Sequence, residues 1–169
     1  MKALIISDSH GLTNELEMIK ERHGHEVDVM IHCGDSELES TSKEMESFIT
    51  VRGNCDFDSG YPNEAIYEFG DNKIYTTHGH LYNVKMTLMN LDYRAREVGA
   101  NIVCFGHSHV AGTELIDGVL YINPGSIRLP RMRKEGTYVT IEERAHEMIV
   151  KFHDIDGYVI KSLTTVVNL

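Results

Sequence analysis

The first half of the chain alternates short apolar runs with stretches of helical periodicity. Residues 2–6 form a compact apolar run, which indicates a buried strand. Leu12, Leu16 and Ile19 then recur at helical spacing and predict a helix over about 13–23. The same reading predicts a polar helical stretch near 39–46 and further strands at 27–31, 48–51, 64–69, 73–77 and 101–105.

A second helix is predicted before the strand at 101–105. Asn83 is placed to cap its beginning and Gly99 to end it. One face of this helix is apolar and consists of Val84, Leu88, Leu91, Ala95 and Val98.

The second half of the chain is rich in strands. Residues 112–116 and 119–122 flank Asp117-Gly118, a strong hairpin signal. Later strands are predicted at 137–141, 148–153 and 158–164. Strands and helices in this order predict a layered α+β or α/β fold, and a length of 169 residues suits a single domain over 1–169.

Charge and cysteine content narrow the classes of function. The net charge of −10 opposes stable binding to duplex nucleic acid, where a basic face supplies most of the affinity. It still allows an anionic substrate if bound cations offset the acids. The three cysteines, Cys33, Cys55 and Cys104, form no disulfide framework and suit a reducing compartment. The N-terminal apolar run is too short for a signal peptide and no stretch suits a membrane span, so we expect a cytoplasmic protein.

Polar residues with metal-binding chemistry follow five of the predicted strands. Since carboxyl ends of strands in such folds meet at one edge, these residues are expected to converge. Imidazole nitrogens combined with carboxylate and amide oxygens suit borderline divalent cations. Two such ions roughly 3.5–4 Å apart can activate one water and clamp a phosphate. The residues are Asp8, His10, Asp35, Asn54, His78, His107 and His109.

The motifs that hold these residues resemble those of the calcineurin-like metallophosphoesterase superfamily, and specifically its small YfcE-like phosphodiesterase branch. They are Asp8-Ser9-His10, Gly34-Asp35, Gly53-Asn54-Cys55-Asp56, His78 and Gly106-His107-Ser108-His109, in this order. The resemblance implies a β-sandwich of two packed mixed β-sheets flanked by helices. It also implies a hydrolase in which a dimetal-activated hydroxide cleaves a small or nucleotide-like phosphodiester.

The resemblance also assigns roles to single residues. It implies that Asp8, His10 and His109 hold one metal, that Asn54, His78 and His107 hold the other, and that Asp35 bridges them. Asp35, Asn54 and His107 are the residues we also expect to act in catalysis. Manganese is the expected metal, with Ni, Fe, Co, Zn and Mg as alternatives. Ligand imidazoles must be neutral, so activity should fall on acidification.

One position departs from the family pattern. Most of the superfamily has a histidine after the motif asparagine, which is thought to protonate the leaving group; here the residue is Cys55, and Asp56 loses its expected partner. An unperturbed thiol is a poor acid at neutral pH. His80 is an alternative acid, although it could equally be an exposed loop residue.

The remaining candidates have simpler interpretations. His32 is expected to be structural, Cys33 and Cys104 to be core residues, and His23, His25, His146 and His153 to lie on the surface. Asn123-Pro124-Gly125-Ser126 is a turn that in the family lies beside the site. The one basic cluster is either a solvated loop or a contact to substrate phosphate or another subunit, and contains Arg128, Arg131, Arg133 and Lys134.

Two other functions compete with the phosphodiesterase. A non-catalytic scaffold, like the retromer subunit of the same fold, would have an eroded metal site, whereas all seven ligands are intact here. A nuclease is opposed by the negative charge. The expected partner is a small phosphodiester, with no membrane and no duplex nucleic acid, and relatives suggest a homodimer or homotetramer.

Overall fold

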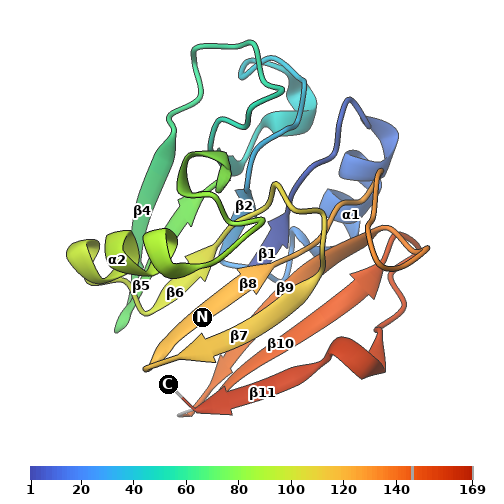
Figure 1. Ribbon diagram of the computed structural model, residues 1–169. Helices are drawn as coiled ribbons and strands as arrows, with labels where there is room; N and C mark the ends of the chain where they lie inside the picture. Colours follow the sequence, from blue (N-terminus) through green and yellow to red (C-terminus); the bar gives the residue numbers. More distant parts are fainter. Residues whose placement is uncertain (146, 169) are drawn as a thin grey trace.

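Two β-sheets packed face to face form the centre of the protein (Figure 1). The computed structural model describes residues 1–145 and 147–168. The core between the sheets takes apolar residues from both, including Ile5 and Ile31 from one sheet and Ile74 and Ile122 from the other. Cys33 and Cys104 are buried in this core, as predicted. The expected β-sandwich is confirmed.

The first sheet has six strands in the order β11-β10-β9-β1-β2-β3. β1 pairs in parallel with β2, and β2 with β3, so the carboxyl ends of these three strands lie at the same edge. β9, β10 and β11 continue the sheet in antiparallel pairs. The strands are β1 (Lys2–Ile6), β2 (Val29–His32), β3 (Phe48–Thr50), β9 (Thr137–Arg144), β10 (Glu147–Asp154) and β11 (Thr165–Asn168).

The second sheet has five strands in the order β4-β5-β6-β8-β7. Its three central strands are parallel, and an antiparallel strand closes each edge. The strands are β4 (Glu64–Phe69), β5 (Asn72–Thr77), β6 (Ile102–Cys104), β7 (Gly112–Ile116) and β8 (Val119–Asn123). The parallel part therefore adds further carboxyl ends that lead into loops.

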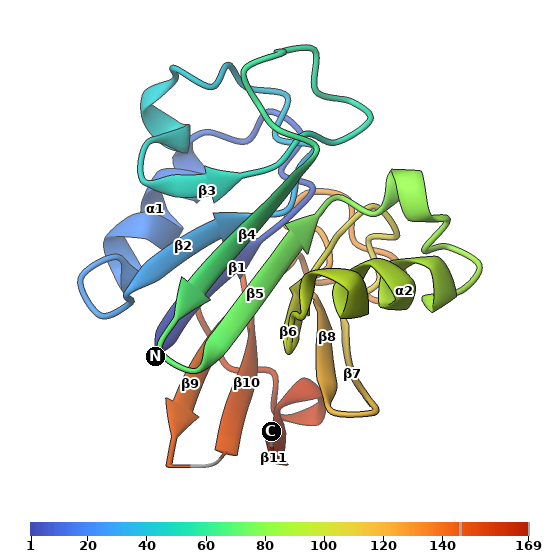
Figure 2. The same ribbon diagram turned by 90° about the vertical axis from the view of Figure 1, so that its left-hand side faces the viewer.

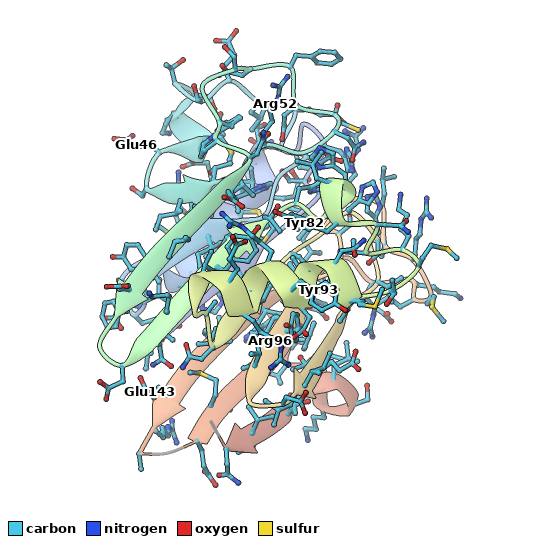
Figure 3. All side chains as sticks on the ribbon, turned by 60° about the vertical axis from the view of Figure 1, so that its left-hand side comes forward. Glu46, Arg52, Tyr82, Tyr93, Arg96 and Glu143 are labelled. Carbon is cyan, nitrogen blue, oxygen red and sulfur yellow. The ribbon has the colours of Figure 1, made fainter. Side chains whose placement is uncertain are left out.

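One helix covers the outer face of each sheet (Figures 1 and 2). α1 (Asn14–His23) buries Leu16 and Ile19 against the first sheet. α2 (Met89–Val98) buries Leu91 and Ala95 against the second. Figure 3 shows the outward part of α2, where Tyr93 is exposed and Arg96 pairs with Asp117 in the turn between β7 and β8. No helix in the described residues is long and apolar enough to cross a membrane.

The predicted start of the second helix is wrong. Asn83 adopts a left-handed conformation (φ 56°) and ends a short 3-10 turn, η2 (His80–Tyr82), so it does not cap a helix. Residues 84–88 form turns before α2 begins at Met89. Val84 is nevertheless buried against the sheet, which explains why its spacing matched a helix. Gly99 ends α2 in a left-handed conformation (φ 69°), as predicted.

Two further predicted elements are wrong. The helical stretch near 39–46 contains only the 3-10 turn η1 (Lys43–Met45), which buries Met45. The strand predicted at 158–164 is replaced by one bridge at Val159 and the 3-10 turn η3 (Lys161–Leu163). The last strand starts later because β10 pairs with residues 165–168 through the register Met148 to Val167.

Two histidines predicted to be on the surface are buried. His23 donates or accepts a hydrogen bond with the Tyr138 hydroxyl (2.9 Å), and the ring of His153 stacks on Tyr138. Each histidine has a charged neighbour in sequence, Arg22 before His23 and Asp154 after His153, but both lie where the end of α1 meets β9 and β10, which local polarity does not reveal. His25 is exposed, as predicted, and His146 lies outside the described residues.

Candidate metal centre

Loops from both sheets meet at one edge and are tied together by backbone hydrogen bonds. The Asp8 N–H donates to Gly34 O (3.0 Å), and the His10 N–H donates to Asp35 O (3.0 Å). Within the second sheet, the Gly106 N–H donates to His78 O (3.0 Å), and between the sheets the His107 N–H donates to Asp8 Oδ2 (3.2 Å). The loops after β1, β2, β5 and β6 therefore converge, as expected from the ends of parallel strands.

Asp8, His10 and His109 form one cluster. Asp8 Oδ1 lies 3.0 Å from His109 Nε2 and 3.8 Å from His10 Nε2. The two imidazole nitrogens, His10 Nε2 and His109 Nε2, lie only 3.3 Å apart. Burial opposes ionisation of Asp8, but His109 and His78 outweigh it and lower the pKa of this carboxyl.

Asp8, Asp35 and His78 form a second cluster that shares Asp8 with the first. His78 Nε2 lies 3.2 Å from Asp35 Oδ2 and 3.9 Å from Asp8 Oδ1. Burial opposes the charged imidazole, yet these carboxylates raise the pKa of His78 above its ordinary value. Burial likewise opposes ionisation of Asp35, but His78 and the Cys55 backbone N–H lower the pKa of Asp35.

Three of the imidazoles are held in the same way. The Nδ1 atoms pair with oxygens outside the clusters: His10 with Glu37 Oε1 (2.5 Å), His78 with Cys33 O (2.7 Å) and His109 with Leu129 O (2.8 Å). An N–H at Nδ1 leaves the Nε2 lone pair free and directed toward the carboxylates. This arrangement is typical of histidine metal ligands.

The backbone at the site is unusually strained. Five of the seven predicted ligands have left-handed φ angles, a region that non-glycine residues seldom adopt. The angles are 53° for Asp8, 45° for His10, 55° for Asp35, 67° for His107 and 59° for His109. Such residues each cost of order 1–3 kcal/mol and persist mainly at functional sites.

Glycines beside the ligands permit this close approach. A Cβ at Gly53 would collide with the Asp35 carboxylate. A Cβ at Gly106 would collide with Ser7 Oγ and the Asp8 carboxylate. The glycines noted in the sequence motifs are therefore required for space at these two positions.

Buried polar atoms without hydrogen bonds indicate what the site holds. Asp8 Oδ1 and His78 Nε2 are both buried and make no hydrogen bond to any described residue. Leaving such atoms unsatisfied is costly, and nitrogen and carboxylate oxygen lone pairs facing one another suit divalent cations. The residues present thus fit a metal site.

The remaining predicted ligands lie around these clusters. The His107 ring lies 5.2 Å from that of His78, and burial lowers the pKa of His107 to about 4, so the imidazole is neutral. Asn54 is adjacent to the site through the Cys55 N–H, which donates to Asp35 Oδ1 (2.7 Å). The Asn54 side chain itself is exposed, and its amide donates to Cys55 Sγ (3.3 Å).

The Cys55 thiol also faces the site. Its sulfur belongs to a possible ligand group with His10 and Asp35. Burial and the Asp35 carboxylate raise the pKa of Cys55 to about 11, so the thiol keeps its proton at neutral pH. His80 lies nearby, with its ring 5.4 Å from that of His78, and burial lowers the pKa of His80.

Sequence reasoning missed several residues that support the ligands. Asp56, described above as lacking a partner, accepts backbone hydrogen bonds from Asp35 (2.8 Å), Glu37 (2.8 Å) and Gly53 (2.7 Å). Ser7 Oγ donates to Asp8 Oδ2 (2.5 Å). The position of Asp56, two residues after the predicted ligand Asn54, could have indicated its supporting role. Nothing in the sequence singled out Ser7 or Glu37.

The loop after β8 lies against the site. Ser126 Oγ donates to Asp8 O (2.6 Å), and Arg128 donates to His10 O. The basic cluster therefore begins beside the ligands and is not simply a solvated loop. His32, predicted to be structural, is buried and hydrogen-bonds with Ser9 Oγ (2.9 Å); burial lowers the pKa of His32 to about 4.

Comparison with known proteins agrees with this geometry. The model of the calcineurin-like phosphoesterase superfamily domain matches residues 1–146. The chain is 50% identical to the probable metallophosphoesterase YsnB of Bacillus subtilis, and the match covers 100% of both proteins. It is 31% identical to the phosphodiesterase MJ0936 of Methanocaldococcus jannaschii, over 74% of this chain and 83% of that protein.

A solved structure is similar over nearly the whole chain. It is a crystal structure of a predicted phosphoesterase from Streptococcus pneumoniae TIGR4, with a TM-score of 0.96 and 37% identity. The match covers 99% of this chain and 97% of that one.

Proposed function

The chain belongs to the calcineurin-like phosphoesterase superfamily, and we propose that it is a phosphodiesterase whose site holds two divalent cations. The observation that carries the proposal is the pair of buried atoms without hydrogen bonds, Asp8 Oδ1 and His78 Nε2, between two clusters of ligand atoms. The similarity to a named phosphodiesterase supports the diester preference.

The residues would divide between the two ions as the sequence predicts. Asp8, His10 and His109 would hold one ion, and His78, His107 and Asn54 the other. Asp35 would bridge them; it lies 3.2 Å from His78 and also belongs to a possible ligand group with His10, although Asp8 and His10 each belong to two groups as well. Manganese is the first choice, because imidazole with oxygen donors suits it, with Ni, Fe, Co, Zn and Mg as alternatives.

The protein's own residues would orient the reaction. Bound divalent ions supply a more acidic water and neutralise charge on the phosphoryl oxygens. In the hydrolysis a water oxygen bonds to phosphorus, the bond from phosphorus to the leaving oxygen breaks, and the leaving oxygen gains a proton. Neutral His107 and the amide of Asn54 are the groups we expect to face the phosphoryl oxygens.

Protonation of the leaving group is the weaker part of the site. A thiol with a pKa of about 11 carries a proton but releases it reluctantly, so Cys55 is a poor general acid. We therefore expect a preference for diesters with good leaving groups. His80 is the other candidate, and an unchanged rate of His80→Ala on a diester with a poor leaving group would exclude it.

The cellular compartment of the protein is also a proposal. Three free cysteines suit a reducing compartment, and we propose the cytoplasm. A single domain, and a homodimer or homotetramer, stay predictions.

A chromogenic assay tests the function. Metal-free protein and the Asp35→Asn variant are each reconstituted with Mn, Ni, Co or Mg and offered bis(p-nitrophenyl) phosphate and p-nitrophenyl phosphate. We expect the wild type to cleave the diester faster than the monoester, and the variant to be at least ~10²-fold slower. Equal, negligible rates in both proteins with every metal would contradict the proposal and favour the scaffold.

A further inference from the structure

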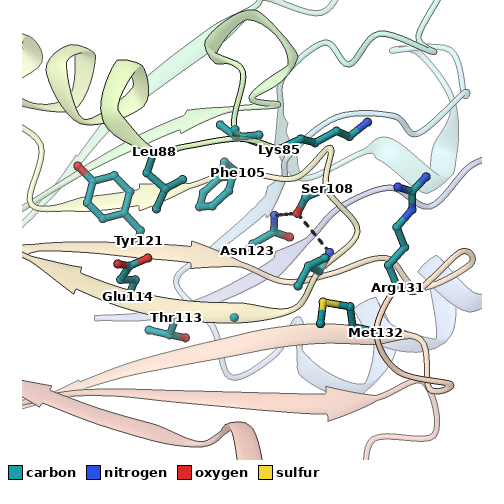
Figure 4. Close-up of a pocket in the computed structure, with 13 residues that line it drawn as sticks. Lys85, Leu88, Phe105, Ser108, Thr113, Glu114, Tyr121, Asn123, Arg131 and Met132 are labelled. Carbon is teal, nitrogen blue, oxygen red and sulfur yellow. Dashed lines mark hydrogen bonds between the residues drawn. The ribbon is translucent and has the colours of Figure 1, made fainter.

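A cavity of about 520 Å³ adjoins the metal centre on the outer face of the second sheet. It lies between the start of α2 and the edge strand β7 (Figure 4). The turns at 84–88, which replace the predicted first part of the helix, form one of its walls. Its volume falls within the range typical of small-molecule sites.

The cavity is continuous with the ligand loops. Ser108 lines it and lies between His107 and His109 in the chain. Lys85 is another lining residue. Arg131 lines it as well, and its backbone N–H donates to His109 O (3.0 Å). A substrate phosphate at the metals would therefore lie at one end of this cavity.

The lining changes from basic to apolar to acidic along its length (Figure 4). Lys85 and Arg131 lie on the side of Ser108 away from Glu114, and the Arg131 backbone contacts the predicted ligand His109. Glu114 lies at the opposite end.

Between the charged ends the walls are apolar and include two aromatic rings. They are formed by Leu88, Phe105 and Tyr121. The Tyr121 hydroxyl already donates to Asp92 (2.7 Å), so only its ring is available to a ligand. Met132, which is 92% exposed, lies at the rim and adds apolar surface that a bound group would cover.

We propose that this cavity binds one ester group of the substrate and that this group is a nucleoside. The inference rests on the proposed phosphodiesterase function. A nucleoside phosphodiester has an anionic phosphate for the basic end and a flat ring for the apolar walls. Its base also offers an N–H group that Glu114 accepts at the far end.

Gly112 allows the cavity to be filled without disturbing the fold. It lines the cavity, and a Cβ built there would meet nothing within 4 Å. In the β7–β8 pairing it lies opposite Asn123, on the same face as Glu114 opposite Tyr121. Gly112→Phe therefore places a ring in the cavity, and Gly112→Ala is the matched control for the backbone change.

The experiment compares two esters that release the same chromophore. Adenosine 5′-(p-nitrophenyl phosphate) has the nucleoside, and methyl p-nitrophenyl phosphate does not. For Gly112→Phe we expect kcat/KM to fall about tenfold or more with the adenosine ester, mainly through KM, and to stay within about twofold with the methyl ester. Gly112→Ala should change neither, and Glu114→Leu should also affect only the adenosine ester.

The outcomes separate the cavity from the function. Equal effects on both esters, or none, in Gly112→Phe and Glu114→Leu would overturn the nucleoside inference while the phosphodiesterase stands. If neither ester is cleaved by the wild type, calorimetry with adenosine 5′-monophosphate decides. Binding that Gly112→Phe weakens about tenfold supports the cavity without the enzyme, and no binding overturns the inference.

Discussion

The two sides of the candidate metal centre differ in how strongly the structure constrains their side chains. On one side Asp8 and His109 are strained in the backbone, and the carboxylate is fully buried. On the other side the Asn54 side chain is exposed, and its one hydrogen bond goes to Cys55. The comparison indicates that the protein fixes the ligands of one proposed ion firmly, and leaves Asn54, a proposed ligand of the other ion, and Cys55 beside it less constrained.

Removal of a group on the fixed side should have the largest effect. Asp8→Asn keeps the shape of the side chain but takes away the charge shared by both ligand clusters. We expect kcat/KM on a chromogenic diester to fall by about 10³-fold. Asp58→Asn is a suitable control, because Asp58 accepts hydrogen bonds from Ser40 and Gly60 away from the site. Similar losses in the two variants would show that the effect of Asp8 is merely structural.

The space beside Asp8 can be tested separately from its charge. In Gly106→Ala the new Cβ would press against Ser7 and Asp8, so we expect unfolding free energy to fall by about 1–3 kcal/mol. Gly112→Ala places its Cβ in open space and should stay within about 0.5 kcal/mol of the wild type. Urea denaturation of the metal-free proteins measures both. A Gly106→Ala variant as stable as the wild type would show that the loops relax easily.

The sequence predicted the fixed side better than the other. Strand ends and glycine spacing were enough to expect that Asp8, Asp35 and His78 converge, because parallel strands bring their ends together. The left-handed backbone at Asp8 and Asp35 was not predictable, since the loops after β1 and β2 hydrogen-bond to each other, which the local sequence does not reveal.

Supporting contacts on the fixed side should have intermediate effects. Glu37→Ala removes the acceptor that orients His10. We expect metal affinity to fall about 10–100-fold, as is usual when such a contact to a ligand histidine is lost. Equilibrium dialysis measures the affinity, and Glu39→Ala, in the same exposed loop, is the control. Equal affinities would mean that His10 needs no such support.

Acidification should weaken metal binding on the fixed side, because its histidines become protonated. Asp8 raises the pKa of His109, and Asp35 and Asp8 raise that of His78, so protons compete with metal above the ordinary histidine value. Apparent metal affinity should fall about tenfold or more per pH unit below these pKa values. A diesterase rate undiminished at about pH 5 with metal supplied would contradict this expectation.

The shifted pKa values of these groups also determine how the stability of the metal-free protein changes with pH. Groups with a raised folded pKa, His78 and His109, stabilise the fold fully below their unfolded pKa and lose this contribution as pH rises through the folded value. Asp8 and Asp35 have lowered pKa values, so their contribution is present above the unfolded value and is lost in acid. Denaturation at several pH values should show both trends.

The smallest effect is expected at the less constrained side. The thiol of Cys55 has a pKa of about 11, so Cys55→Ala should change the rate on a nitrophenyl diester by less than about threefold. Cys55→His would restore the residue usual in the superfamily. It should accelerate diesters with poor leaving groups, by up to about 10²-fold. A large loss in Cys55→Ala would show that the thiol acts in the reaction after all.

The cavity beside the metal centre could not be predicted from the sequence, because one of its walls was predicted to be a helix. The apolar spacing of Val84 and Leu88 matched a helix, although both residues pack from turns. Both residues contact the second sheet at the spacing expected of a helix, although the backbone there is not helical. The turn brings Lys85 into the cavity wall, where the pattern alone predicted only a helix surface.

The number of metal ions per chain tests the central claim most directly. Metal-free wild type and Asp35→Asn are dialysed against Mn, the bound ions are counted by elemental analysis, and diesterase activity is followed at each loading. If Asp35 bridges two ions, the wild type should bind two per chain, with activity appearing as the second binds, and the variant should lose the second ion and the activity. A wild type that saturates at one ion per chain with full activity would contradict the two-metal account.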